Sequence, residues 1–228
     1  LMTWEYRTNF SAYYQFFDNF GTMQDETIRY YKDGVVNMML QYTTGSGLAS
    51  MSDLNVYLNS KILWNVYADQ EKLIDDFMNA FYKTGAPYVK EYLNLMRSHL
   101  AAVNVEQAGN FHMGMYSTDT PSYQTAKTWS RAVLEKALDL LGKASATYDE
   151  IEDPEQRERL KNRVLRESVC VRYIVLSNYE SYYNIYSPDY DKAIDEWEAD
   201  LKTLNASCHR EGGSVGSFID ELRRKGKG

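Results

Sequence analysis

The chain has 228 residues, 44% hydrophobic and 25% charged, which is enough to bury the core of one large domain or two small ones. Its formal net charge of −7 and its isoelectric point near 5.1 argue against nonspecific binding of nucleic acid, because no basic face is available to replace phosphate counterions. No apolar run approaches the roughly 20 residues that a membrane span requires.

Cysteine and histidine give no sign of a disulfide framework or a metal centre. Cys170 lies in an apolar run and is expected to be a buried free thiol, and the only other cysteine is Cys208. His99, His112 and His209 fall in separate elements without the spacing of metal ligands. We therefore expect neither a metal nor another cofactor.

The beginning of the chain predicts two strands, each followed by a loop and a helix. Residues 1–6 and residues 35–42 are rich in strand formers, and the second run is so apolar that we expect both of its faces to be covered. Apolar strands separated by a helix favour a parallel sheet. Loops such as the aromatic-rich residues 13–20 would then lie at the carboxyl ends of the strands, where (β/α) barrels bind their substrates.

Two such units cannot close a barrel, and the chain opens on Leu1 inside a strand-like run. We interpret the chain as the C-terminal piece of a longer protein, with the remaining strands upstream of Leu1. The predicted fold class is α/β plus all-α, with the last two βα units of a TIM-type (β/α) barrel in residues 1–66 and a helical bundle in residues 67–228.

Capping residues and apolar periodicity place the helices of the two βα units. Asp25 is expected to begin a helix that Gly34 ends, and Ser52 or Asp53 to begin the helix that ends at Trp64. Because Trp64 stands where the chain changes from βα units to helices, we expect its ring to be buried at that junction.

The remaining residues are expected to be almost entirely helical. The expected helices cover residues 69–82 with Asp69 as N-cap, 86–105, 123–146, 154–184, 190–204 and 215–224, with a loop at residues 109–121 and a hinge at Gly212 and Gly213.

Candidate site residues lie at the carboxyl ends of the two predicted strands. Glu5 lies between Trp4 and Tyr6, and Gln41 and Tyr42 occupy the equivalent place on the second strand. Aromatic rings can stack on the apolar C–H faces of sugars, and a neighbouring carboxylate can hold sugar hydroxyls. The alternative is that Trp4 packs in a core and Glu5 meets an arginine.

Residues 4–96 also carry a series of short motifs in a characteristic order. The motifs are Trp4-Glu5-Tyr6, Asn9-Phe10, Phe16-Phe17-Asp18-Asn19, Gly34-Val35-Val36, Ile62-Leu63-Trp64-Asn65, Asp69, Phe81-Tyr82 and Ala86-Pro87-Tyr88. This order resembles the C-terminal part of the bacterial domain of unknown function 4838, the domain of glycoside hydrolase family 163. The chain departs from the family pattern in having Glu5 for Asp, Val66 for Pro, no prolines in the first loop, and Lys83-Thr84-Gly85 for a single Gly.

The resemblance implies a retaining, endo-β-N-acetylglucosaminidase-like hydrolase of N-glycans, in which the 2-acetamido group of the substrate is the nucleophile. It implies an extracellular, cell-surface or periplasmic location. It also implies that the principal catalytic acids lie upstream of Leu1, so we assign no catalytic residue here and expect the isolated chain to be inactive. Trp4, Glu5, Tyr6, Gln41 and Tyr42 would form one wall of the glycan site.

A different hypothesis remains open for the helical part. Residues 179–190 are rich in tyrosine, and exposed tyrosines there would suit a non-catalytic module that binds a glycan or a partner protein.

Overall fold

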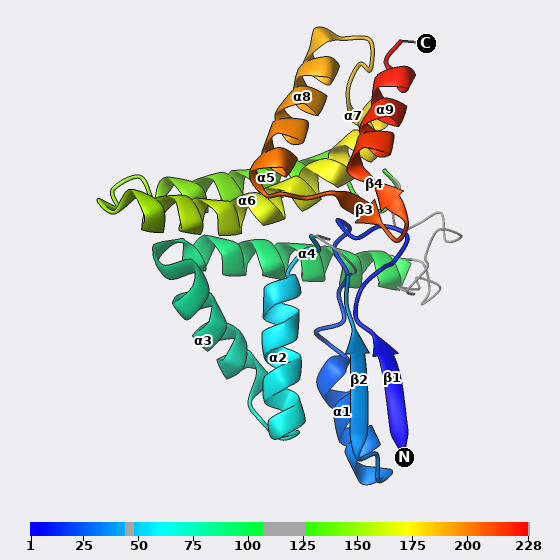
Figure 1. The fold of residues 1–228 in the computed structure, drawn as a ribbon, viewed down its shortest axis with the longest axis vertical. Helices are drawn as coiled ribbons and strands as arrows, with labels where there is room; N and C mark the ends of the chain where they lie inside the picture. Colours follow the sequence, from blue (N-terminus) through cyan, green and yellow to red (C-terminus); the bar gives the residue numbers. More distant parts are fainter. Residues whose placement is uncertain (44–47, 107–125, 228) are drawn as a thin grey trace.

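The structure is a computed structural model that describes residues 1–43, 48–106 and 126–227. The elements are β1 (Met2–Tyr6), α1 (Met23–Lys32), β2 (Asn37–Gln41), α2 (Ser52–Trp64), α3 (Gln70–Tyr82), the 3-10 turn η1 (Lys83–Gly85), α4 (Ala86–Glu106), α5 (Arg131–Ala146), α6 (Pro154–Ser177), α7 (Tyr179–Tyr182), α8 (Pro188–Thr203), β3 (Cys208–Arg210), β4 (Gly213–Ser214) and α9 (Val215–Lys225). In Figure 1, α4, α5 and α6 run across the middle of the molecule, with β1, β2 and α1 to α3 on one side and α8 and α9 on the other.

The two N-terminal strands form a parallel pair, as the sequence predicts. Trp4 lies beside Met39, and Tyr6 lies beside Gln41. Side chains alternate along each strand, so one face of the pair carries Met2, Trp4 and Tyr6 of β1 and Asn37, Met39 and Gln41 of β2. We call this the open face, since most of these side chains are exposed. The expectation that both faces of the second strand are covered is therefore wrong for the described chain, and the closed barrel stays a prediction.

The loop that follows β1 packs into the helical part of the molecule. Tyr13 and Tyr14 are completely buried, and the ring of Tyr14 meets the rings of Tyr173 and Trp197 edge to face, with centroids 5.6 Å and 5.9 Å away. The backbone N–H of Tyr13 donates to the carbonyl of His209 (2.8 Å). One hydrophobic core therefore runs from this loop into the helices, across the boundary predicted at residue 66.

Trp64 is 92% exposed, which overturns the prediction that it is buried at a junction. The buried apolar side chains of α2 are Leu54, Leu58 and Ile62, which follow one another every four residues on one face. Trp64 is two residues beyond Ile62 and therefore points about 200° away around the helix. Helical geometry places it on the solvent side.

One end of each of α1, α3 and α6 agrees with the capping or turn residue that predicts it. The side chain of Asp69 accepts from the backbone N–H of Lys72 and caps α3, Gly34 takes a left-handed φ of 75° after α1, and Pro154 is in the first turn of α6. The N-cap of α1 is Thr22, so Asp25 lies in the first turn instead of capping the helix.

Other predicted boundaries are wrong. The helix expected from residue 123 begins at Arg131, where the hydroxyl of Ser130 caps it, and the longest helix ends at Ser177. Glu211 and Gly212 form the turn of the antiparallel β3–β4 hairpin, and Gly213 begins β4, where a hinge was expected; Gly212 takes a φ of 67°. The loop predicted at residues 109–121 lies outside the described residues.

Candidate functional site

The open face brings together three of the five predicted site residues. The rings of Trp4 and Tyr6 are stacked, with centroids 6.1 Å apart and an interplanar angle of 23°. The indole N–H of Trp4 donates to the side-chain oxygen of Gln41 (2.9 Å), which fixes the ring across the two strands. Trp4 is 52% and Tyr6 36% exposed. The result is a flat aromatic surface with polar atoms at its edge.

Glu5 belongs to the opposite face of the sheet. Its carboxylate accepts hydrogen bonds from the hydroxyl of Tyr30 on α1 and from the hydroxyl of Thr3 (3.0 Å). The bond to Glu5 raises the pKa of Tyr30. The strand therefore separates Glu5 from Trp4 and Tyr6, and the predicted cluster of a carboxylate between two rings does not form.

Tyr42 also turns away from the open face. Its hydroxyl accepts from the side-chain amide of Asn59 on α2 (3.0 Å), and burial raises the pKa of Tyr42 to about 12. We assign Glu5 and Tyr42 to the packing of the strands against α1 and α2.

Arg7 is a residue that the sequence interpretation missed. It follows β1 directly and is buried, and its Nη1 pairs with the carboxylate of Glu26 on α1 (3.0 Å). Among the described residues its Nε and Nη2 atoms have no hydrogen-bond partner. Arg7 is one of the residues that line a small enclosed pocket at the carboxyl ends of the strands, together with Tyr42 and Ser50. An arginine directly after a strand is the only sequence signal for it.

A buried glutamate joins the second βα unit to the helical bundle. The carboxylate of Glu167 on α6 accepts from the hydroxyl of Ser50 (2.8 Å) and from the backbone N–H of Met51 (3.0 and 3.1 Å). Met51 takes a left-handed φ of 53° directly before α2, and the hydroxyl of Ser50 also lies 3.2 Å from that of Tyr92. Burial raises the pKa of Glu167 from its ordinary 4.5 to about 7.

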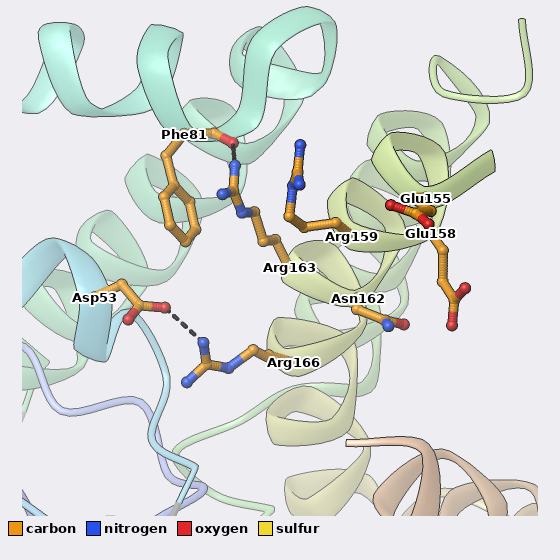
Figure 2. Close-up of a pocket in the computed structure, with 8 residues that line it drawn as sticks. All are labelled: Asp53, Phe81, Glu155, Glu158, Arg159, Asn162, Arg163 and Arg166. Carbon is orange, nitrogen blue, oxygen red and sulfur yellow. Dashed lines mark hydrogen bonds and ion pairs between the residues drawn. The ribbon is translucent and has the colours of Figure 1, made fainter. Parts of the chain in front are cut away.

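A surface hollow of about 530 Å³, which we call the arginine groove, lies between α6 and the ends of α2 and α3 (Figure 2). It is lined by Asp53, Phe81, Glu155, Glu158, Arg159, Asn162, Arg163 and Arg166. Arg166 pairs with Asp53 (2.7 Å), and Arg163 donates to the carbonyl of Phe81 (2.5 Å). None of these residues belongs to the predicted site.

Metal-binding clusters and membrane-spanning helices are absent from residues 1–43, 48–106 and 126–227. Within these ranges His, Cys, Asp and Glu side chains do not gather in groups of three or more that could hold a metal ion. Every helix there is too short or too polar to span a bilayer. Cys170 is a buried free thiol, as predicted, and Cys208 is free and half-buried.

Comparison with known protein families finds a match for the N-terminal part of the chain. Residues 1–94 match the family model described as "Domain of unknown function (DUF4838)". No curated protein and no solved structure matches the chain. The match covers β1, β2, α1, α2 and α3, and it confirms the resemblance to this domain that the motif order indicates.

Proposed function

From the match of residues 1–94 to the DUF4838 family model, we propose that the chain supplies one wall of the glycan-binding site of a glycoside hydrolase. The resemblance to glycoside hydrolase family 163 suggests the reaction. It is the cleavage of the chitobiose core of N-glycans with retention, assisted by the 2-acetamido group of the substrate, in a protein exported to meet glycans.

The observation that carries this proposal is the pair of exposed aromatic rings on the open face. The stacked rings of Trp4 and Tyr6 offer a flat apolar surface of the kind that fits the C–H face of a pyranose ring. The hydroxyl of Tyr6 and the amide of Gln41 can exchange hydrogen bonds with sugar hydroxyls at the edge of that surface. A purely structural pair of strands would not need two large exposed rings on one face.

The position of the rings supports the same proposal. Tyr6 is the last residue of β1 and Trp4 lies two residues before it, so the stacked pair extends to the end at which (β/α) barrels bind substrate. Because α1 covers the opposite face, the open face is the one that would line the interior of a barrel. Glu5, the single carboxylate of β1 and β2, points toward Tyr30, so we propose that the catalytic acids come from other strands.

The alternative function, a binding module built on tyrosines, draws less support. Tyr179 and Tyr190 are buried, and their rings pack against each other with centroids 4.7 Å apart. Tyr182 donates to the carbonyl of Trp129 (2.5 Å). Of the tyrosines in residues 179–190, Tyr186 is the exposed one, at 71%. The tyrosines of residues 179–190 therefore mainly pack the interior of the helical bundle.

Calorimetric titration of the chain with a chitobiose-core N-glycan tests the proposal. Trp4→Ala removes a stacking ring and should weaken binding by about threefold to tenfold, the effect of about 0.5–1.5 kcal/mol from an aromatic contact. Trp64→Ala is the matched control, because Trp64 is the other exposed tryptophan and lies at the far end of α2. Equal affinity of the two variants, or absence of binding by the unaltered chain, would contradict the proposal.

A further inference from the structure

Three arginines line one side of the arginine groove. Arg159, Arg163 and Arg166 follow one another at spacings of four and three residues, so they share one face of α6. In Figure 2 Arg163 extends toward Phe81 and Arg166 toward Asp53, and the side chain of Arg159 lies on the same side of the helix. Glu158 points away from them. This side of the groove therefore presents three positive charges and the one carboxylate of Asp53.

Two of the three guanidinium groups are held in place by the protein. Arg163 donates from Nη1 to the carbonyl of Phe81, and its guanidinium carbon lies 4.0 Å from the centroid of the Phe81 ring. Arg166 donates from Nη1 to Asp53, and its side chain is 32% exposed. Fixed guanidinium groups lose little conformational freedom when they bind a planar or tetrahedral anion.

Most of the N–H donors of these arginines remain available. A guanidinium carries five N–H groups, and the contacts of Arg163 and Arg166 occupy one donor of each. Arg159 is exposed and, within the described part of the chain, has no hydrogen-bond or ion-pair partner. A concentration of free donors is notable in a protein whose net charge is −7.

We propose that the arginine groove binds an oxyanion, the carboxylate, sulfate or phosphate group of a small ligand, held between Arg159 and Arg163 with Arg166 beside them. Arginine pairs with such groups through two parallel N–H bonds, which makes it the preferred residue for their recognition. A volume of about 530 Å³ admits a ligand of the size of an acidic mono- or disaccharide. Most of the groove is built by α6, outside residues 1–94, so this site is independent of the proposed glycan wall.

The test is an NMR chemical-shift titration with three probes: inorganic phosphate, sulfate and glucuronate. Sodium chloride holds the ionic strength constant, because exposed charges are screened by salt, and glucose serves as the neutral sugar. We expect a saturable response of the groove residues to at least one of the three anions and none to glucose. A response to glucuronate alone identifies a sugar carboxylate as the ligand group, and a response to phosphate or sulfate alone identifies a tetrahedral anion.

Two variants with the same change in net charge make the test specific. Arg159→Gln removes an exposed, unpartnered guanidinium from the groove, so the fold should persist while the affinity falls about tenfold or more. Arg157→Gln removes a guanidinium from the same helix about 200° away, and its affinity should stay within about twofold of the unaltered chain. The inference is overturned if no anion gives a saturable response, or if both variants weaken binding equally.

Discussion

The buried carboxylate of Glu167 should make the stability of the protein depend on pH near neutrality. Burial raises the pKa of Glu167 from 4.5 to about 7, because the ionised form loses its hydration inside the bundle. The hydrogen bonds from Ser50 and Met51 and the charge of Arg166 favour the ionised form, and Asp53 disfavours it. The effect of burial is the largest of these.

The sign of the effect follows from proton binding. Since the folded state binds this proton more tightly than the unfolded chain does, protonation of Glu167 stabilises the fold. That contribution is complete below pH 4.5 and is lost as the pH rises through 7. With about 1.4 kcal/mol for each pKa unit, the loss between pH 5 and pH 8 is about 2–3 kcal/mol.

The assay is the free energy of unfolding in urea at pH 5 and pH 8, for the unaltered chain and for Glu167→Gln. The variant resembles the protonated state at both pH values, so its stability relative to the unaltered chain should rise by about 2–3 kcal/mol from pH 5 to pH 8. His209, whose pKa burial lowers, titrates with the opposite sign in both proteins and cancels from the difference.

Glu198→Gln is the control for this comparison. Hydrogen bonds from Lys202 and Arg223 lower the pKa of Glu198, so this carboxylate stays ionised from pH 5 to pH 8. Its variant should therefore show no change in relative stability over that interval. A Glu167→Gln difference that stays constant within about 0.5 kcal/mol would refute the reasoning.

Four other substitutions have expected effects on the free energy of unfolding, which denaturation in urea measures. Gly85→Ala should lower the free energy of unfolding by about 1–3 kcal/mol, because a Cβ there would lie 2.3 Å from the hydroxyl of Tyr148. Gly142→Ala should raise it by up to about 1 kcal/mol, because the residue lies in a helix interior and a Cβ there would meet nothing within 4 Å. Trp64→Ala should change stability by less than about 0.5 kcal/mol, since the ring is exposed; a loss above 2 kcal/mol would show that it is packed. Glu5→Gln should cost about 0.5–1.5 kcal/mol and leave glycan affinity unchanged; reduced affinity would return Glu5 to the site.

Local signals in the sequence predicted the elements well. Asp69, Pro154 and Gly34 mark the ends of helices through interactions within a few residues of the chain. The parallel pairing of β1 with β2 follows from two apolar strands separated by a helix. Such features need no knowledge of distant contacts.

The site was harder to predict because it depends on directions and on distant partners. Alternation along β1 places Glu5 opposite Trp4 and Tyr6, a consequence of strand geometry that the sequence already contained. The arginine groove needs Asp53 and Phe81 next to residues of α6 about a hundred positions further along the chain. Periodicity shows which side chains share a helix face, and it does not show which element they meet.

The sequence alone did not predict that the loop after β1 is buried. Tyr13, Tyr14, Phe16 and Phe20 are buried, although the loop has no regular structure to give their spacing a period. A loop with so many large aromatic residues is unlike a solvated substrate loop, and here it forms the core between the strands and the bundle.

The most direct test of the glycan wall is an NMR spectrum of the four tryptophan indole N–H groups during titration with a chitobiose-core N-glycan. Trp4 is exposed on the open face, Trp64 is exposed on α2, and Trp129 and Trp197 are completely buried. The proposal predicts that the Trp4 signal shifts saturably and that the other three stay in place. A shift of Trp64 instead, or no shift of Trp4 at saturating glycan, would contradict it.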